Sequence, residues 1–267
     1  APIGIPSYIE PWDPWADETE RSVVEALNTA LDLGFNYVDT APGYGDGRAE
    51  ELIGKALAAR RSEFHLATKT PAPRGGWQAI TADHVISAAE ASLRRLQTDV
   101  IDVLQFHGGI WSQRDAAAVI DGPAYAAYQT LQEAGKVRFL GVTGEDPEAL
   151  RPFIESDRFD VVQLRYNVIH QAAWYSILPL CAQKGLGVVV MRPLSSGIFQ
   201  KLMRQADPAI DERLDLSALA LNYVLSDARI STAIVGMRRA AEVRANNRIS
   251  DDDGRRLDLE WLHARQV

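Results

Sequence analysis

The sequence has almost no cysteine and no long apolar run. Cys181 is the only cysteine among 267 residues, so an intrachain disulfide and a metal cage of cysteine ligands are both excluded. No apolar run reaches the roughly eighteen residues that a membrane-spanning helix needs, and no charged-then-apolar leader opens the chain. Histidine and acidic residues also lack the spacing of a metal site. We therefore expect a cytoplasmic protein with no membrane partner and no metal.

Basic residues are fewer than acidic ones. Lys and Arg number 28 and Asp and Glu number 36, and the difference is a net charge of −8. A nucleic-acid partner is not expected, because binding to phosphates requires clustered basic side chains. The short basic pairs Arg60-Arg61 and Arg94-Arg95 are interpreted as solvated helix ends.

Apolar, β-branched runs alternate with amphipathic segments along the chain. Runs such as GVVVM and IDVLQF are typical of parallel strands buried on both faces. Eight equal strand–helix units without a break in composition favour a closed (β/α)8 TIM barrel over an open doubly wound α/β sheet. We expect one domain over residues 1–267 with an extra C-terminal helix at 252–264. Because APIGIPSYI begins without methionine inside a strand pattern, we also expect further residues to precede it. The expected strands are 3–9, 35–40, 64–70, 101–107, 137–144, 160–167, 186–194 and 230–237, and the expected helices are 19–33, 50–60, 81–96, 125–134, 147–155, 175–184, 217–225 and 240–247.

Polar residues stand at the ends of these expected strands. Active sites of this fold lie at the carboxyl ends of the strands and in the loops that follow. Side chains at those ends are therefore the candidates for function. They are Asp39, Lys69, His107, Thr143, Gln163 with Asn167, Arg192 and Arg238.

The stretch FNYVDTAPGYGDGRAEELIG has two interpretations. It could hold a phosphate, as a dinucleotide-binding loop does, or it could present Tyr44. A Rossmann loop requires a third glycine where Arg48 stands, and an acidic residue at the end of the next strand, where Lys69 stands. The pattern therefore favours a bent glycine loop that holds Tyr44 over the barrel mouth.

Tyr44, Lys69, Asp39 and His107 together suit one kind of chemistry. The pKa of a phenol is about 10, and a nearby ammonium lowers it by favouring the phenolate. An aspartate would keep that ammonium charged, and a neutral histidine would orient a carbonyl through a hydrogen bond. Such a group can donate a proton to a carbonyl oxygen while hydride reaches the carbon. Asp39 alone could be a structural cap and Lys69 alone a barrel ion pair, but the four together favour function.

At these residues the sequence resembles the aldo-keto reductase family, over nearly the whole chain. The resemblance is carried, in the family's order, by GFNYVDTAPGYGDGRAEELIGKAL, ATKT, DVIDVLQFHG, GKVRFLGVTG, DVVQLRYN, VVVMRPLSSG and IVGMRRAAEVRANN. It implies that Tyr44 is the general acid, or the base in the oxidative direction. Lys69 and Asp39 would tune its pKa, and His107 would orient the substrate.

The resemblance also implies a nicotinamide cofactor, usually NADPH, bound without a Rossmann fold. Gln163 matches the position that holds the carboxamide, and Met191 matches the position that backs the ring. Arg238 opens the last helix, where a cation and free backbone N–H groups would favour a ribose 2′-phosphate, and hence NADP over NAD. The implied cofactor-binding residues are Ser7, Thr143, Gln163, Met191 and Arg192, the pyrophosphate loop at Leu194, Ser195 and Gly197, and the adenosine end at Gly236, Arg238, Glu242 and Asn246.

Two positions differ from the family's pattern. The family commonly has Ser-Asn after the fifth strand, where this chain has Thr143-Gly144. Its Gly-Thr after the first strand is replaced by Pro6-Ser7. A hydroxyl is kept at both places, while the amide contact to the nicotinamide is lost.

The implied function is an NADP-dependent oxidoreductase. It would transfer hydride between nicotinamide and an aldehyde, ketone or sugar carbonyl, or the corresponding alcohol, so its partner would be a small carbonyl or alcohol molecule. Similar barrels serve as β subunits of potassium channels, so a nucleotide-sensing regulatory barrel with little turnover is the alternative. The substrate, the preferred direction and the oligomeric state are left open.

Five of the six tryptophans lie in or beside loops that follow expected strands. Because these loops surround the mouth of a barrel, we expect an aromatic-walled substrate pocket. The alternative is that the rings pack loops onto helices. The five are Trp12, Trp15, Trp77, Trp111 and Trp174.

Overall fold

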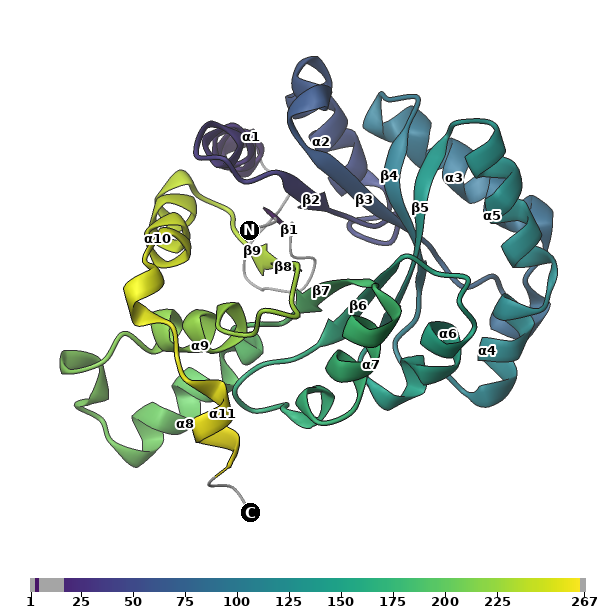
Figure 1. Ribbon diagram of the computed structural model, residues 1–267. Coiled ribbons are helices and arrows are strands. Elements are labelled where there is room, and N and C mark those ends of the chain that lie inside the picture. Colours follow the sequence, from purple (N-terminus) through teal and green to yellow (C-terminus); the bar gives the residue numbers. More distant parts are fainter. Residues whose placement is uncertain (1–2, 5–16, 265–267) are drawn as a thin grey trace.

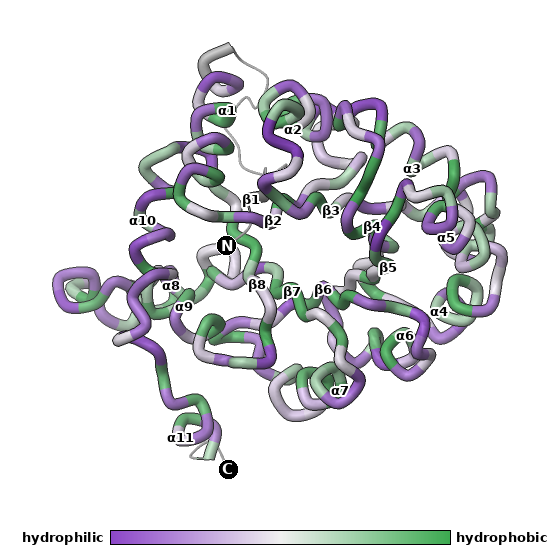
Figure 2. The backbone as a smooth tube through the Cα atoms, turned by 45° about the horizontal axis from the view of Figure 1, so that its top comes forward, coloured by the Kyte–Doolittle hydropathy of each residue, from purple (hydrophilic) through white to green (hydrophobic). Residues whose placement is uncertain are grey.

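The structure is a computed structural model that describes residues 3–4 and 17–264 of the chain. Parallel strands form a ring in chain order, and helices surround that ring on the outside (Figures 1 and 2). This arrangement confirms the expected (β/α)8 TIM barrel.

From the first to the seventh, each strand pairs in parallel with the strand that follows it in the sequence. The register sets the polar ends side by side: Lys69 is paired with Gln105, His107 with Thr143, and Thr143 with Gln163. Since paired residues of parallel strands point to the same face, these side chains share the barrel interior. The strands are β1 (Ile3–Gly4), β2 (Tyr37–Asp39), β3 (His65–Thr70), β4 (Ile101–His107), β5 (Val137–Gly144), β6 (Val161–Arg165), β7 (Gly187–Met191), β8 (Thr232–Ala233) and β9 (Val235–Gly236).

The barrel closes through one interrupted segment. The last expected strand, 230–237, is split at Ile234 into β8 and β9. β8 pairs with β7, and β9 pairs with β1, so the same stretch of chain joins the two edges of the sheet. The Ile234 amide still donates to Val190 O at 2.8 Å, which holds the interruption against β7.

The expected helices are present, and two further ones were not expected. These are α4, which begins after Ser112, and α8, which follows the loop after β7. The helices are α1 (Asp17–Asp32), α2 (Arg48–Leu57), α3 (Ala82–Leu96), α4 (Gln113–Ile120), α5 (Pro123–Glu133), α6 (Arg151–Glu155), α7 (Ile177–Lys184), α8 (Ile198–Ala206), α9 (Leu216–Leu225), α10 (Ala240–Asp251) and α11 (Leu259–His263).

The extra C-terminal helix is shorter than the expected 252–264. A 3-10 turn, Asp253–Arg255, is followed by extended chain and then by α11, which lies outside the ring of helices (Figure 2). The break has a local cause. The Leu257 amide donates to Ser226 Oγ at 2.7 Å, and the Asp258 side chain accepts from the Trp261 amide at 2.9 Å, which starts a new helix.

Alternation along each strand separates the packing side from the site side. On β4, Leu104 and Phe106 are fully buried in the apolar layer under the helices, where Phe106 contacts Tyr128 at a ring separation of 4.4 Å. Gln105 and His107 point to the other face, inside the barrel. The apolar layer thereby fixes the strand ends that carry the polar side chains.

Among the residues that the structure describes, none of the helices combines the length and hydropathy needed to cross a bilayer.

Candidate active site

A buried ion pair lies between the ends of β2 and β3. Lys69 Nζ is 2.8 Å from each carboxylate oxygen of Asp39 and 2.7 Å from Thr40 O. The side chains of Lys69 and Asp39 are 1% and 2% exposed. All three ammonium protons therefore have acceptors, which compensates for the loss of water around the charge.

The ion pair holds Lys69 in its charged form. Burial opposes the charge, but the Asp39 carboxylate and then the Tyr44 hydroxyl outweigh burial, and the Lys69 pKa is raised. Burial likewise raises the pKa of Asp39, while Lys69 and Gln105 act in the opposite direction. Both Asp39 oxygens accept from Lys69, as a carboxylate does. The pair thus keeps a fixed cation at the barrel mouth.

Tyr44 lies in the glycine-rich loop between β2 and α2. The loop turns back through Gly45, Asp46 and Gly47, whose φ angles are 59°, 53° and 90°, before α2 begins at Arg48. This left-handed conformation suits glycine, and only the small polar Asp46 adopts it among side-chain-bearing residues here. The Tyr44 ring centroid lies 5.2 Å from Lys69 Nζ. The loop therefore presents a phenol to the ammonium.

His107, the last residue of β4, completes the group. Its ring lies edge-on to that of Tyr44, with centroids 5.9 Å apart and planes at 83°. Burial and then the charge of Lys69 lower the pKa of His107 to about 3. The imidazole is therefore neutral near pH 7. A phenol, a cation that favours its deprotonation and a neutral hydrogen-bonding imidazole are thus brought together, an arrangement able to move a proton to or from a carbonyl oxygen.

Thr143 and Gln163 adjoin this group on β5 and β6. Thr143 is 1% exposed, and its hydroxyl donates to Gly108 O at 3.0 Å. Gln163 is 2% exposed and contacts Gln105, a site residue that the sequence reasoning missed. The available signal was the alternation in IDVLQFH, which places Gln105 on the same face as His107.

Asn167, in contrast, is used to hold the loops. Its amide donates to Arg192 O at 2.8 Å and its oxygen accepts from the backbone amides of Ile169 and His170 at 3.0 Å. The side chain therefore fixes the chain that follows β6 and β7.

The loop after β7 has features of an anion site. Met191 and Leu194 are half-buried, and Arg192, Ser195, Ser196 and Gly197 all have positive φ angles. Ser195 Oγ is buried without a hydrogen-bond partner among the described residues. The loop leads into the nine-residue helix α8, whose first backbone N–H groups have no carbonyl partner within the helix. An unsatisfied hydroxyl beside a helix N-terminus fits a phosphate group.

Gly236 ends β9 and Glu242 and Asn246 lie on α10, while Arg238 lies between them, one residue before Arg239, at which the helix is capped. The backbone N–H groups of Arg238 and Arg239, just before α10, are not free. Glu242 Oε2 accepts from the Arg238 amide at 2.7 Å and from the Arg239 amide at 3.3 Å. A carboxylate thus bonds both of these amides. Such a reach back from the third helical position is a capping interaction.

Three of the tryptophans make packing contacts with neighbouring elements. Trp77 and Trp111 are 7% and 5% exposed and stack with ring centroids 4.7 Å apart. Trp111 Nε1 donates to Thr143 O at 2.7 Å, so this ring holds the loop after β4 against β5. Trp174 stacks on His263 of α11 at 4.3 Å. These contacts favour the alternative that the rings pack loops onto helices, and the aromatic pocket stays a prediction. Trp12, Trp15 and the expected cofactor residue Ser7 lie outside the described residues.

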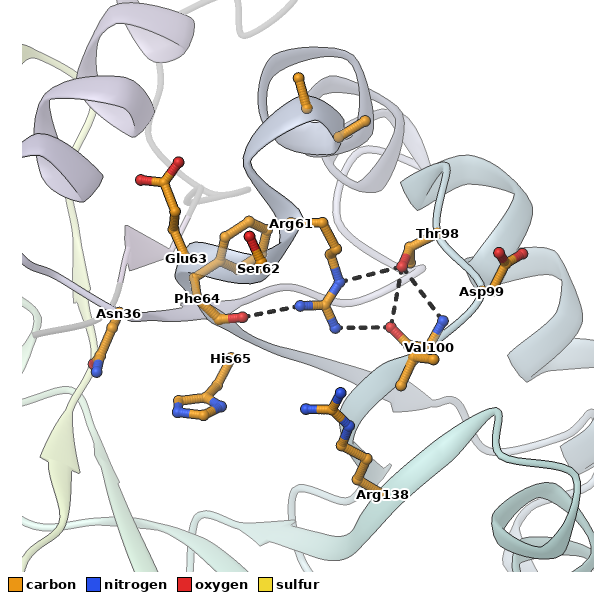
Figure 3. A pocket seen from close by; sticks show the side chains of 12 residues that line it. Asn36, Arg61, Ser62, Glu63, Phe64, His65, Thr98, Asp99, Val100 and Arg138 are labelled. Atoms are coloured by element: carbon orange, nitrogen blue, oxygen red, sulfur yellow. Dashed lines mark hydrogen bonds between the residues drawn. The ribbon is translucent and has the colours of Figure 1, made fainter.

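A cavity of about 620 Å³ opens at the opposite end of the barrel (Figure 3). It lies at the amino ends of β3, β4 and β5. Its arginine Arg61 donates to Thr98 Oγ1, Phe64 O and Val100 O. Through these bonds Arg61 joins the segments that precede β3 and β4. Since catalytic residues of this fold stand at the carboxyl ends of strands, the cavity is not the candidate site.

Comparisons with known proteins identify the family of this chain. The Aldo/keto reductase family model matches residues 11–214. A solved aldo-keto reductase from Bacillus halodurans, in its holo form, is 27% identical with a TM-score of 0.77, covering 97% of this chain and 88% of that one. Another from Klebsiella pneumoniae, in complex with NADP and acetate, is 26% identical with a TM-score of 0.76, covering 98% and 89%. L-galactose dehydrogenase of Arabidopsis thaliana is 28% identical, over 85% of this chain and 77% of that protein. The chain belongs to the aldo/keto reductase family of oxidoreductases.

Proposed function

We propose that the protein is an NADP(H)-dependent reductase of small aldehydes, ketones or sugar carbonyls, with Tyr44 as the general acid. The same residues would serve oxidation of the corresponding alcohols. One observation carries the proposal: the Tyr44 ring lies 5.2 Å from a buried Lys69 ammonium and edge-on to a neutral His107.

Each residue has a separate part in the proposed reaction. The Lys69 charge favours the phenolate of Tyr44 and so makes its proton easier to release. Asp39 keeps Lys69 charged and in place through its two 2.8 Å contacts. His107, being neutral, donates a hydrogen bond to the carbonyl oxygen and orients it. When bound, the nicotinamide supplies the hydride, and the proton of Tyr44 goes to the oxygen.

The residues present fit the nicotinamide cofactor at two places. Gln163 and Thr143 offer polar atoms for a carboxamide inside the barrel. Ser195, with its unsatisfied hydroxyl, and the start of α8 offer donors for a pyrophosphate. The Klebsiella relative bound to NADP supports the choice of NADP. Because Glu242 accepts from the backbone amides of Arg238 and Arg239, just before α10, the Arg238 side chain would be the group that recognises a 2′-phosphate there.

Replacement of Tyr44 tests the proposal. Tyr44→Phe keeps the ring and removes the acidic proton, so kcat should fall about 10²- to 10⁴-fold while the Kd for NADPH stays within about twofold. Turnover is measured by NADPH consumption with a panel of aldehydes, ketones and sugars, and Kd by fluorescence titration.

A matched control is Tyr125→Phe, which removes a hydroxyl from α5, on the outside of the barrel. It should leave both kcat and Kd unchanged. Full activity in Tyr44→Phe would exclude Tyr44 as the general acid.

A further inference from the structure

Gln105 connects the ion pair to Gln163 inside the barrel. The Gln105 side chain is fully buried. Its Nε2 lies 3.4 Å from Asp39 Oδ1 and 3.2 Å from Gln163 Oε1, so it donates to both. Its own Oε1 is buried and has no partner among the described residues. One amide therefore links a carboxylate on β2 to an amide on β6.

The chemistry of Asp39 decides the orientation of both amides. A carboxylate can only accept hydrogen bonds, so the amino group of Gln105 must face it. The same amino group also faces Gln163, which must then present its oxygen to Gln105. Reversing either amide would set two donors or two acceptors against each other in a buried place, which is unfavourable.

Gly141 provides the room for this link across β5. It is paired in register with Gln105, and a Cβ atom at this position would lie only 2.7 Å from Gln105 Cγ. It would also lie 3.2 Å from Val161 O on β6. The missing side chain on β5 lets Gln105 reach over that strand to Gln163.

We propose that Gln105 is a positioning residue that fixes the side-chain amide of Gln163. The Gln163 oxygen faces Gln105, so the Gln163 amino group faces the cofactor and donates to the carbonyl oxygen of the nicotinamide carboxamide. The inference rests on the proposed function, since it concerns the orientation of the cofactor. Thr143 complements this arrangement. Its hydroxyl donates to Gly108 O, which leaves its lone pairs to accept from the carboxamide amino group.

A cofactor analogue makes the orientation measurable by binding alone. In the 3-acetylpyridine analogue of NADP+ the carboxamide NH₂ is replaced by a methyl group, while the carbonyl oxygen remains. A donor at Gln163 keeps its contact with the analogue, but an acceptor at Gln163 loses it. The measured quantity is the ratio of the Kd of the analogue to the Kd of NADP+, from calorimetry or quenching of tryptophan fluorescence.

Gln105→Glu should reverse the Gln163 amide. Whether ionised or protonated toward Asp39, the new carboxyl group presents an acceptor to Gln163, which then turns its amino group inward and its oxygen to the cofactor. The Kd ratio should rise about tenfold above the wild-type ratio, the effect of one lost hydrogen bond. Gln105→Met removes the amide and leaves Gln163 free to turn, so its ratio should stay near the wild-type value. If Gln105 had a purely structural role, each variant would change its Kd for NADP+ and its Kd for the analogue by the same factor. The Kd ratio of Gln105→Glu and that of Gln105→Met would then both equal the wild-type ratio.

Gln163→Met provides a second test if Gln105→Glu does not fold. Loss of the donor should weaken binding of NADP+ and of the analogue by the same factor. A loss confined to NADP+, or an unchanged ratio in a folded Gln105→Glu variant, would overturn the inference while nicotinamide binding by the wild type still supports the proposed function. Failure of the wild type to bind either nucleotide would overturn both.

Discussion

A neutral imidazole beside a fixed cation is the main electrostatic feature of the site at the scale of residues. His107 shares its surroundings with the Tyr44 ring and the Lys69 ammonium. Burial removes the water that would stabilise an imidazolium, and the positive charge of Lys69 repels a second cation. His107 can therefore hydrogen-bond a carbonyl across the physiological range without taking the proton that Tyr44 is proposed to deliver.

The lowered pKa of His107 makes stability depend on pH. Because this pKa is about 3 in the folded chain and about 6.5 in a model peptide, the unfolded chain binds more protons between these values. The contribution is fully present above about pH 6.5 and is lost as pH falls toward 3. His107→Gln should therefore lose less free energy of unfolding than the wild type between pH 7 and pH 4, as measured by urea denaturation. His65→Gln, at an exposed position, should keep the wild-type dependence; equal slopes in all three proteins would contradict the assignment.

Buried carboxylates pair with arginines of neighbouring elements of the barrel. Asp102 on β4 is 1% exposed and accepts from the Leu66 amide at 2.8 Å and from Arg138 on β5 at 2.7 Å, as well as from Arg61. Glu50 on α2 is fully buried and pairs with Arg95 of α3. Arg61 and Arg95 were expected to be solvated helix ends, and this interpretation is wrong. The sequence shows where a helix ends, but not which buried carboxylate lies beside that end.

Asp102→Asn should weaken the junction of β3, β4 and β5. The substitution keeps the shape but removes the charge that two arginines share, at a cost of about 2 kcal/mol. For a chain of this size we expect the melting temperature to fall by about 5 °C. Calorimetry measures this change, and NADPH affinity should remain unchanged because the site is at the other end. Asp99→Asn, at an exposed neighbour with no ion pair among the described contacts, should not shift the melting temperature. A shift as large as that of Asp102→Asn would contradict a stabilising role of the Asp102 ion pairs.

Local signals predicted most elements and also explain the two helices that were missed. α4 begins where Ser112 Oγ accepts from the Asp115 amide at 3.1 Å, a cap that is visible in the sequence. α8 has apolar residues at helical spacing, including Ile198 and Leu202, but Gly197 and the serines before it read as a loop. The split of the last strand at Ile234 was not predictable. It follows from closing the ring against both β7 and β1.

At the scale of the whole molecule, the strands on one side of the barrel are longer than those at which the barrel closes. We call β8 and β9, where it closes, the seam. β3, β4 and β5 are six to eight residues long, whereas β8 and β9 have two residues each. The loop after β7, with its positive φ angles, adjoins this seam in the sequence and in the ring (Figure 1). Segments with few ladder hydrogen bonds open at lower free energy than the core of a sheet.

Native-state hydrogen exchange should therefore divide the barrel into two parts. Amides of β4 and β5 should exchange slowest, at rates set by global unfolding, and amides of β8 and β9 should exchange at least about tenfold faster. Addition of NADPH should slow exchange in the seam more than in β4. Uniform protection around the ring would mean that closure is as strong as the rest of the sheet.

The sequence by itself determined the alternation of strands and helices, the polar residues at the strand ends and the presentation of Tyr44 by a glycine-rich loop. These are local properties, since hydrophobic period, caps and turn residues act over a few neighbouring positions. Only the tertiary structure decided that Gln105 reaches Gln163 over Gly141. It also decided that Glu242 accepts from the backbone amides of Arg238 and Arg239. The first contact joins residues 58 apart, and it exists because the register and closure of the barrel bring separate strands to one level. The second is local, but it is a competition between two acceptors for the same donors, which folded geometry alone resolves.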